Sequence, residues 1–419
     1  LASFRKALSL KPNYREALKN LAIALRQLGT LEDALAVCQK VLDLDPDDAQ
    51  THSNLLVMEQ YRTGHTTETL YKLHGEWDHQ HGHVFRTHWP QHNNSPVPDR
   101  LLRVGFVSPD LRHHPVGYFV MGMFEHLKRN SIEIIVYSSC LGDDLTSRIK
   151  TTCDNWKDVR WTSDEDLAQE ILGDQIDILV DLSGHYTSNR LLVFARKPAP
   201  VQLTWAGYVG TTGLSAIDYL VTDRYSTPLN EEIFYSEKIV RMPDGWLSYT
   251  PPDYAPDVGL LPLEQNGHVT FGSFSTRLKI NDEVINTWTN ILQRLPQSRL
   301  LLKYSTMDSM TNREFFTTQL AKKGIHRSRV KLEGWSPHSQ LLARYNDVDI
   351  ALDPFPYSGG ITTYEALWMG VPVITVPGAT FASRHSASHL STMGLTELIA
   401  TNIDDYVHSI RLWTVTLEL

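Results

Sequence analysis

Two series of short apolar runs constrain the fold of this chain more than any other feature. The first series predicts strands at 101–107, 132–138, 176–182, 201–206 and 219–222, and the second at 269–274, 300–304, 330–332, 349–352 and 371–376. Helical patterns separate the runs, and apolar runs of this kind are typical of parallel strands covered by helices. We therefore expect two Rossmann-like α/β halves that bind ligands at the carboxyl ends of their strands.

The first part of the chain is repetitive. A set of small or apolar residues and a proline recurs after a shift of 34 residues: Ala2, Phe4, Ala7, Leu8 and Pro12 are followed by Ala36, Cys38, Val41, Leu42 and Pro46. This is the tetratricopeptide period, in which each repeat is a helical hairpin. Solenoids of such repeats present a binding face, so we expect a peptide or protein partner there.

These patterns predict five segments in order. They are tetratricopeptide repeats over 1–85, a linker over 86–100, an N-terminal half over 101–250, an interdomain linker over 251–267 and a C-terminal half over 268–419. Prolines among polar residues mark both linkers.

Composition excludes several classes of function. The formal net charge of -9 argues against nucleic-acid binding that relies on neutralising the phosphates. Three cysteines without CxxC spacing favour a reducing compartment and no structural zinc. No apolar run is long enough for a membrane span, and no GxGxxG follows the first strand, which disfavours NAD and FAD. We expect a cytoplasmic protein without membrane or nucleic-acid partners.

The segment 358–368 predicts a phosphate cradle. A buried strand over 349–353 leads into two glycines and then into an apolar helical run that two threonines open. Free N–H groups at a helix start attract anions, and glycines allow close approach. The candidate residues are Gly359, Gly360, Ile361, Thr362 and Thr363. A turn that merely caps the helix is the competing interpretation.

Lys279 is the strongest single candidate. It follows the first strand of the second half, in the segment 274–280, together with Thr276. A cation at this strand end would face the Gly-Thr loop and stabilise a departing diphosphate without a metal. A solvated surface lysine is the alternative.

Three loops of the first half also follow strands. His114, in the loop 108–115, could act as a general base near neutral pH, or simply cap the next helix. His185, in the loop 181–187, suits a sugar or an acceptor hydroxyl, with an Asx-type turn as the alternative. Gly207 and Tyr208, in the loop 205–213, indicate close backbone approach or an ordinary loop.

We expect no metal site. The pair Asp347 and Asp349 resembles a DxD motif, but it precedes a buried strand instead of ending one. The histidines between 74 and 92 lack a fixed ligand spacing, which favours docking or packing.

From about 101 to 405 the sequence resembles the O-GlcNAc transferase and SPINDLY family. The motifs that carry the resemblance are His114-Pro115, the segments 196–202, 235–238 and 377–384, and the Gly-Thr loop before Trp368. The resemblance implies a GT-B fold in which the N-terminal half faces the acceptor and the C-terminal half holds the donor. It further implies inverting, metal-independent transfer from a nucleotide sugar, without cofactor, to Ser or Thr of proteins presented along the repeats.

Carried over by position, the resemblance implies roles for further residues. Lys279 and Thr362 meet the donor diphosphate, Glu365 the ribose, and Ser336 and His338 frame the base, with Arg344 following. His114 matches the histidine of the family's His-Pro motif, whose role is open.

Two departures from the family keep the donor open. Ser275 and Thr276 stand where amide residues are common, and Gly360 stands where O-GlcNAc transferases often have histidine. UDP-GlcNAc is our first expectation, and GDP-fucose, which SPINDLY-type proteins use with a glutamate like Glu365, is the second. A repeat scaffold that binds nucleotide sugar without turnover, and a small-molecule GT-B enzyme such as a sugar-nucleotide epimerase, stay open.

Overall fold

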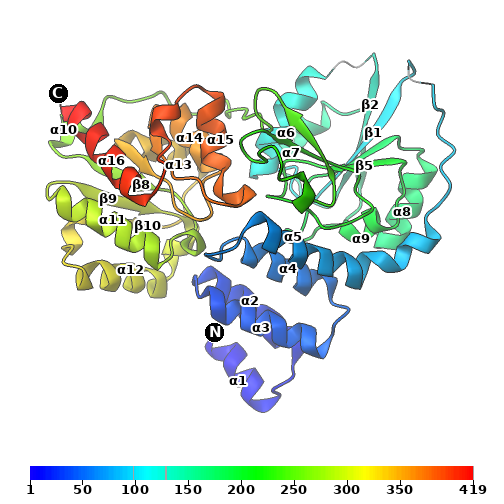
Figure 1. The fold of residues 1–419 in the computed structure, drawn as a ribbon, viewed down its shortest axis with the longest axis horizontal. Helices are drawn as coiled ribbons and strands as arrows, with labels where there is room; N and C mark the ends of the chain where they lie inside the picture. The colour runs from blue at the N-terminus through cyan, green and yellow to red at the C-terminus, as the bar shows by residue number, and fades with distance from the viewer. Residues whose placement is uncertain (98, 128–129, 419) are drawn as a thin grey trace. The chain divides into compact units, whose positions relative to one another are not determined.

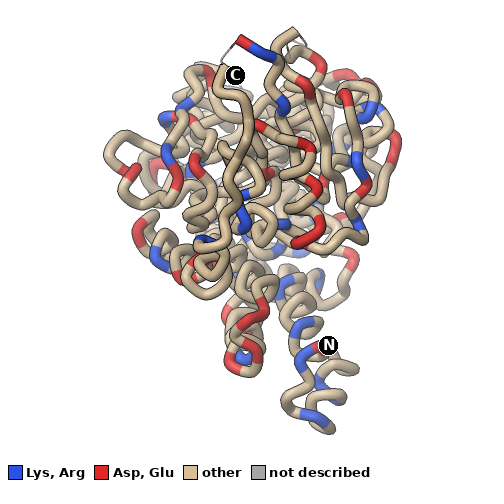
Figure 2. Tube along the Cα trace, turned by 90° about the vertical axis from the view of Figure 1, so that its right-hand side faces the viewer, with Lys and Arg blue, Asp and Glu red and all other residues tan. Residues whose placement is uncertain are grey.

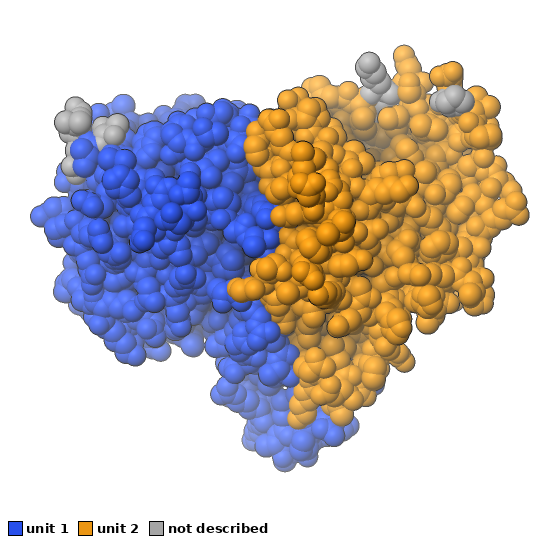
Figure 3. Space-filling view, viewed as in Figure 1, with its two compact units in different colours: residues 1–37, 61–63, 251–419 blue, residues 38–60, 64–250 orange. Residues whose placement is uncertain are grey.

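The chain forms two compact units in the computed structural model, which describes residues 1–97, 99–127 and 130–418 (Figure 1). Unit 1 comprises residues 1–37, 61–63 and 251–419, and unit 2 comprises residues 38–60 and 64–250 (Figure 3). Each unit therefore combines part of the N-terminal helices with one α/β half, and each is described by itself.

The N-terminal part is helical. Its helices are α1 (Ala2–Leu10), α2 (Arg15–Gln27), α3 (Leu31–Leu44), α4 (Ala49–Glu59) and α5 (Thr67–Trp77). Apolar residues of α2 from Ala17 to Leu25 recur at helical spacing and are buried. Gly29, at φ +70°, ends α2 with a left-handed turn that glycine adopts without strain. Asp48 caps α4, and Thr66 caps α5 through a capping box.

Unit 2 contains a seven-stranded parallel sheet. Its strands are β1 (Leu102–Ser108), β2 (Ile132–Ser138), β3 (Asn155–Asp158), β4 (Ile178–Asp181), β5 (Val201–Thr204), β6 (Tyr219–Asp223) and β7 (Lys238–Met242), in the order β3-β2-β1-β4-β5-β6-β7. Its helices are α6 (Pro115–His126), α7 (Asp144–Lys150), α8 (Asp164–Gly173) and α9 (Leu191–Ala195).

The expected strands of this half are present, and the structure adds β3 and β7, which the sequence did not predict. Both are edge strands, and no residue of either is buried. The apolar pattern that marks buried parallel strands is therefore absent from them.

The last two helices of the N-terminal part, α4 and α5, share the core of unit 2. Leu56 of α4 and Trp77 of α5 belong to one buried cluster with Ile135, Tyr137 and Phe194 of the α/β half. Trp77 also donates its indole N–H to the carbonyl of Ala49 at 3.1 Å. These two helices are thus packed as part of this half.

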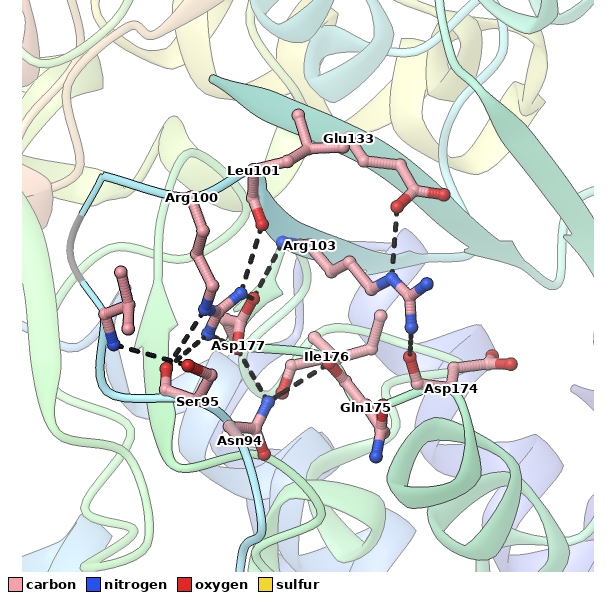
Figure 4. Close-up of polar contacts among 11 residues, drawn as sticks. Asn94, Ser95, Arg100, Leu101, Arg103, Glu133, Asp174, Gln175, Ile176 and Asp177 are labelled. Atoms are coloured by element: carbon pink, nitrogen blue, oxygen red, sulfur yellow. Dashed lines mark hydrogen bonds and ion pairs between the residues drawn. The ribbon is translucent and has the colours of Figure 1, made fainter. Parts of the chain in front are cut away.

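Polar contacts fix the segment before β1 at the amino end of the sheet (Figure 4). The Arg100 guanidinium donates to both carboxylate oxygens of Asp177, at 2.5 and 2.7 Å, and Asn94 Nδ2 donates to Asp177 Oδ1 at 2.7 Å. The backbone N–H of Arg103 donates to Asp177 Oδ2 at 2.9 Å. Burial alone would raise the pKa of Asp177, but these bonds outweigh it and hold that pKa below its usual range.

Unit 1 contains a five-stranded parallel sheet. Its strands are β8 (Thr270–Ser273), β9 (Arg299–Lys303), β10 (Val330–Glu333), β11 (Ile350–Leu352) and β12 (Val373–Ile374), in the order β10-β9-β8-β11-β12. Its helices are α10 (Pro262–Asn266), α11 (Asp282–Arg294), α12 (Met310–Lys322), α13 (His338–Arg344), α14 (Ile361–Trp368), α15 (His385–Thr392) and α16 (Ile403–Glu418). Phe271, Trp288 and Tyr406 are among the residues of its main core.

Charged residues of both signs are spread along the chain. Figure 2 shows acidic and basic residues interspersed along the chain, whose formal net charge is -9. Among the described residues, no helix combines the length and apolar character that crossing a bilayer requires.

Candidate functional site

The candidate site of unit 1 lies where the order of its strands reverses. From β8 the chain proceeds through β9 to β10 on one side of the sheet, and then returns to β11 and β12 on the other side. The carboxyl ends of β8 and β11 are therefore neighbours at a topological switch point, where open α/β sheets bind ligands. Lys279 follows β8, and the Gly-Thr loop follows β11.

Lys279 contacts this loop directly. It lies in a single 3-10 turn, Arg277–Lys279, and its Nζ donates to the carbonyl oxygen of Ser358 at 2.6 Å. The Nζ also lies 4.1 Å from the centroid of the Tyr357 ring. Burial lowers the pKa of Lys279 to about 8, and the charge of Asp353 opposes that shift. The ammonium group thus stays predominantly protonated at pH 7, and in the described chain no carboxylate forms an ion pair with it.

The helix that follows the loop begins without a side-chain cap. Gly360 is the N-cap of α14, and within the described residues the backbone N–H groups of Gly360, Ile361 and Thr362 meet no protein acceptor. The N–H of Gly359, in contrast, donates to Asp353 Oδ1 at 2.6 Å. Open N–H groups at a helix start bind anions. This start lies beside the Lys279 ammonium.

The two glycines of the loop have different surroundings. A Cβ on Gly359 would lie 2.3 Å from Oγ1 of Thr363, whereas a Cβ on Gly360 would meet only His385 Nδ1, at 3.6 Å. The Thr363 hydroxyl is bonded to Ser386 Oγ at 2.7 Å, so Thr363 has a structural contact. Gly359 is therefore required by packing, and Gly360 is not.

A second group of candidate residues surrounds Glu365. This carboxylate is 4% exposed and its Oε1 accepts from His338 Nε2 at 2.8 Å. The other ring nitrogen of His338 is 2.8 Å from the Tyr254 hydroxyl. Burial raises the pKa of Glu365, and the bond from His338 opposes the shift. The buried Oγ of Ser336 meets no hydrogen-bond partner among the described residues.

Arg344 and Thr276 have structural contacts as well. The Arg344 guanidinium donates from Nε to Glu333 at 3.0 Å and from Nη1 to Asp347. This arginine is therefore engaged in ion pairs within its own half. Thr276 precedes the turn that carries Lys279, and its carbonyl accepts from the Lys279 N–H at 3.1 Å.

His114 caps a helix in unit 2. It is the N-cap of α6, and its Nδ1 accepts from the N–H of Val116 at 3.4 Å. Burial lowers the pKa of His114, and Asp110 opposes the shift. Because Nδ1 is the acceptor, the neutral ring carries its proton on Nε2. His114 therefore has the helix-capping contact of the alternative interpretation, and its role as a general base stays a prediction.

His185 has a packing role that the sequence did not reveal. It is fully buried, and its ring nitrogens lie 3.0 Å from Ser53 Oγ and 2.7 Å from the carbonyl of Thr212. Burial lowers its pKa well below the usual value. The loop before it is the Asx-type turn of the alternative interpretation, since Asp181 accepts from the N–H groups of Ser183 and Gly184. A catalytic role for His185 disagrees with this geometry.

Gly207 and Tyr208 also belong to the packing of unit 2. A Cβ on Gly207 would lie 1.9 Å from the carbonyl oxygen of Leu182, so the close approach there is to the protein's own backbone. Tyr208 is 2% exposed, and its hydroxyl is bonded to His74 Nε2 at 2.8 Å and accepts from Gln60 Nε2 at 3.3 Å. A donor-binding role for this pair disagrees with these contacts.

The sequence did not point to Tyr357 or Asp353. Tyr357 supplies the ring beneath Lys279. The Asp353 carboxylate holds the Gly359 N–H and the Thr375 hydroxyl, the latter at 2.6 Å. The sequence could have indicated Asp353 as a site residue, because it directly follows the strand β11.

The acidic residues considered as metal ligands already accept hydrogen bonds from other groups of the protein. Asp349 accepts from the backbone N–H groups of Leu263 and Thr270 at 2.8 and 2.7 Å. Among the described residues, His113, Asp143 and Asp144 bring possible metal-ligand atoms within 4.8 Å of one another, and hydrogen bonds already link His113 to both carboxylates.

Unit 1 also contains a mainly apolar cavity of about 530 Å³, which Leu260, Met369 and Trp413 help to line. None of the candidate donor residues lines this cavity, so its volume carries no weight in assigning the donor site.

Comparison with known proteins gives relatives over most of the chain. SPINDLY of Solanum lycopersicum, described as a probable UDP-N-acetylglucosamine–peptide N-acetylglucosaminyltransferase, is 38% identical over 378 residues, which are 88% of this chain and 40% of that protein. SEC of Arabidopsis thaliana, of the same description, is 31% identical over 73% of this chain and 32% of its own length. The chain thus spans about two fifths or less of these curated relatives.

A solved structure agrees in fold. A mutant of the Thermobaculum terrenum O-GlcNAc transferase matches with a TM-score of 0.93 at 36% identity, over 98% of this chain and 78% of that one. The expected fold class, tetratricopeptide repeats followed by the two α/β halves of a GT-B fold, is confirmed.

Two family matches cover the chain in succession. Residues 1–55 match a tetratricopeptide repeat family, and residues 77–249 and 261–415 match glycosyl transferase family 41. The expected resemblance to O-GlcNAc transferases and SPINDLY is confirmed, and the chain belongs to glycosyltransferase family 41.

Proposed function

We propose that this chain is an inverting glycosyltransferase that moves GlcNAc from UDP-GlcNAc to Ser or Thr hydroxyls of proteins. The observation that carries the proposal is the pairing, within unit 1, of the Lys279 ammonium with the uncapped start of α14. Both lie at the switch point of the sheet, where a nucleotide sugar would bind.

This pairing suits departure of a nucleoside diphosphate. When the acceptor hydroxyl attacks the anomeric carbon, the bond between that carbon and the diphosphate oxygen breaks and negative charge develops on the leaving group. The hydroxyl proton passes to water or to the departing diphosphate. A partly buried ammonium and fixed N–H dipoles stabilise such charge strongly because water around them is reduced. We therefore propose that Lys279 and the N–H groups of Gly360 to Thr362 receive the diphosphate without a metal ion.

The group around Glu365 would hold the nucleoside of either donor. Its carboxylate suits a ribose hydroxyl, and the unpartnered Oγ of Ser336 suits a base edge. SPINDLY and SEC are both described as probable UDP-N-acetylglucosamine–peptide transferases, which supports UDP-GlcNAc as first choice. Glu365 and the missing side chain at Gly360 favour GDP-fucose as the second candidate, because SPINDLY-type proteins share the glutamate.

The repeats support a protein as the acceptor of the sugar. Helical repeats expose extended surfaces that bind peptides, and we propose that substrates reach the site along them. In the described chain no disulfide joins the three cysteines, which fits the reducing cytoplasm that we propose as the setting.

The test begins with calorimetric titration of the protein with UDP and, separately, with GDP, in the presence of EDTA. Preferential binding of UDP supports a UDP-GlcNAc donor, and preferential binding of GDP moves the proposal to O-fucosyl transfer. Loss of binding on addition of EDTA would contradict the metal-free proposal.

A transfer assay completes the test. We expect labelled sugar to appear on Ser or Thr of a peptide substrate, with inverted anomeric configuration. Nucleotide binding without any transfer would support the scaffold interpretation, and release of an altered free sugar nucleotide would support the epimerase interpretation. Either result would contradict protein O-glycosylation.

A further inference from the structure

The ring beneath Lys279 is itself supported by the repeat region. Tyr357, whose centroid is 4.1 Å from the Lys279 Nζ, stacks on Tyr61 with a centroid separation of 4.5 Å and an interplanar angle of 24°. Tyr61 follows helix α4 and belongs to unit 1. Tyr61, Tyr357 and Lys279 thus form one continuous stack from a repeat residue to the candidate catalytic cation.

The neighbour of Tyr61 is held within the repeats. Arg62 Nη2 donates to Glu32 Oε2 of α3 at 2.9 Å. Both side chains are largely exposed, so this pair contributes little free energy. It does restrict where the short segment 61–63 can lie, because it ties that segment to a rigid helix.

The repeats also contact the 3-10 turn that carries Lys279, at the end opposite to this lysine. Arg277 begins the 3-10 turn that Lys279 ends, and a Cβ on Gly29 would lie 2.7 Å from Arg277 Cγ. The Arg277 guanidinium lies 3.8 Å from the Phe315 ring centroid, and its Nη1 donates to the carbonyl of Ile280 at 2.6 Å. The end of α2 therefore packs closely against the side chain that holds this turn.

A further hydrogen bond joins α2 to the α/β half. Asn312 of α12 donates from Nδ2 to the carbonyl of Gln27, the last residue of α2, at 3.3 Å. Asn312 is 1% exposed, so the contact is buried. Residues at the end of α2, Gln27 and Gly29, thus contact both α12 and the turn that carries Lys279.

We propose that the repeats are a structural part of the donor site, and that Tyr61 is a positioning residue that holds Lys279 against the donor diphosphate through Tyr357. This inference rests on the proposed function, since it takes Lys279 as the group that meets the leaving diphosphate. It assigns the repeats a role in addition to presenting acceptors. An aromatic stack suits that role because two flat rings lose little freedom when they are held in contact.

The test compares three substitutions of Tyr61. Tyr61→Phe keeps the stacked ring, Tyr61→Leu keeps apolar bulk without a ring face, and Tyr61→Ala removes both. Tyr14→Ala is the matched control, because Tyr14 is another repeat tyrosine of unit 1, is 43% exposed, and stacks with Lys11 instead. Circular dichroism and melting curves first establish which variants are folded.

Kinetics and nucleotide binding give the first readout. We expect Tyr61→Leu and Tyr61→Ala to lower kcat and the affinity for the preferred nucleoside diphosphate by about tenfold each, because the cation is less well placed. Tyr61→Phe and Tyr14→Ala should match wild type, and KM for the acceptor should not change. An increase confined to the acceptor KM, or a lower melting temperature with unchanged diphosphate affinity, would overturn the inference.

A readout on Lys279 itself does not depend on activity. Reductive methylation with ¹³C-formaldehyde lets NMR follow the pKa of the Lys279 amine, which burial lowers to about 8 in this structure. Tyr61→Leu should raise that pKa toward the usual value of a lysine because water reaches the amine, and Tyr61→Phe should not. An unchanged pKa in the folded Leu variant overturns the positioning role. Absence of any nucleotide binding by wild type would overturn the proposed function, and with it the role of Lys279 at the diphosphate, whatever the pKa shows.

Discussion

Each α/β half begins a helix just after one of its strands, α6 after β1 in unit 2 and α14 after β11 in unit 1. The two helix starts differ in whether a side chain caps them. In unit 2, α6 begins at His114, whose ring accepts from the N–H of Val116. In unit 1, α14 begins at Gly360 without a side-chain cap, next to the Lys279 ammonium. A helix start that the protein has capped is satisfied, whereas an uncapped one beside a cation remains available to a phosphate. This difference is why we propose unit 1 as the donor site.

The largest expected effect follows from removing the charge in unit 1. Lys279→Met keeps the apolar stem but removes the ammonium, and by analogy with a lost oxyanion donor we expect kcat to fall by about 10²–10³-fold. The melting temperature should stay near wild type. Steady-state transfer kinetics check the prediction, with Lys331→Met, at a lysine whose side chain is 64% exposed, as the control. Near-normal turnover would remove Lys279 from the mechanism.

The next effect separates the two glycines of the loop. Gly359→Ala forces a Cβ against Thr363, and an overpacking strain of about 1–3 kcal/mol, if relieved by moving the loop out of its binding position, corresponds to about five- to 150-fold weaker diphosphate binding. Gly360→Ala meets only His385, at ordinary contact distance, so it should bind nearly as wild type. Titration of both variants checks this contrast. Equal losses in the two variants would contradict the predicted difference between the glycines.

A smaller effect is expected at the capped helix of unit 2. His114→Asn retains a good N-cap, whereas His114→Ala should lower stability by about 1 kcal/mol. Loss of a general base costs about 10²–10⁴-fold in rate, and for His114→Asn we expect less than about tenfold. The pH profile of kcat/KM should keep its shape. A lost acidic limb in the Asn variant would restore His114 as the base.

The smallest effect on transfer is expected at the opposite edge of the sheet in unit 2. Asp177→Asn removes the carboxylate that Arg100 and Asn94 hold, so stability should fall while kcat stays unchanged (Figure 4). The folded pKa of Asp177 lies below its unfolded value. Its contribution is therefore present above the unfolded pKa, about 3.9, and is lost as pH falls through the folded pKa.

Melting curves across pH check this linkage. The difference in melting temperature between wild type and Asp177→Asn should be large at pH 7 and shrink toward pH 3. A difference that grows on acidification would contradict the assignment.

Much of the fold was predictable because buried parallel strands carry a continuous apolar signal, and because the repeats have a fixed period. The edge strands β3 and β7 escaped prediction since they bury no residue. Family membership was also readable, from motifs such as His114-Pro115 and the Gly-Thr loop.

The site was only partly predictable. The position of Lys279 beside the loop follows from strand order, which the alternation of elements indicates. In the sequence, His185 and Tyr208 look as suitable for a ligand site as Lys279 does. In the structure their polar atoms are bonded to Ser53 of α4 and His74 of α5. Such contacts join residues more than 130 positions apart, and no local pattern records them. Tyr61 escaped notice for the same reason.

Amide hydrogen exchange in the presence and absence of the nucleoside diphosphate tests the comparison most directly. If the diphosphate binds at the uncapped helix start of unit 1, its addition should slow exchange in a peptide that covers residues 358–364 and leave the peptide that covers 114–118 unchanged. Slower exchange at 114–118 with no change at 358–364 would contradict the account.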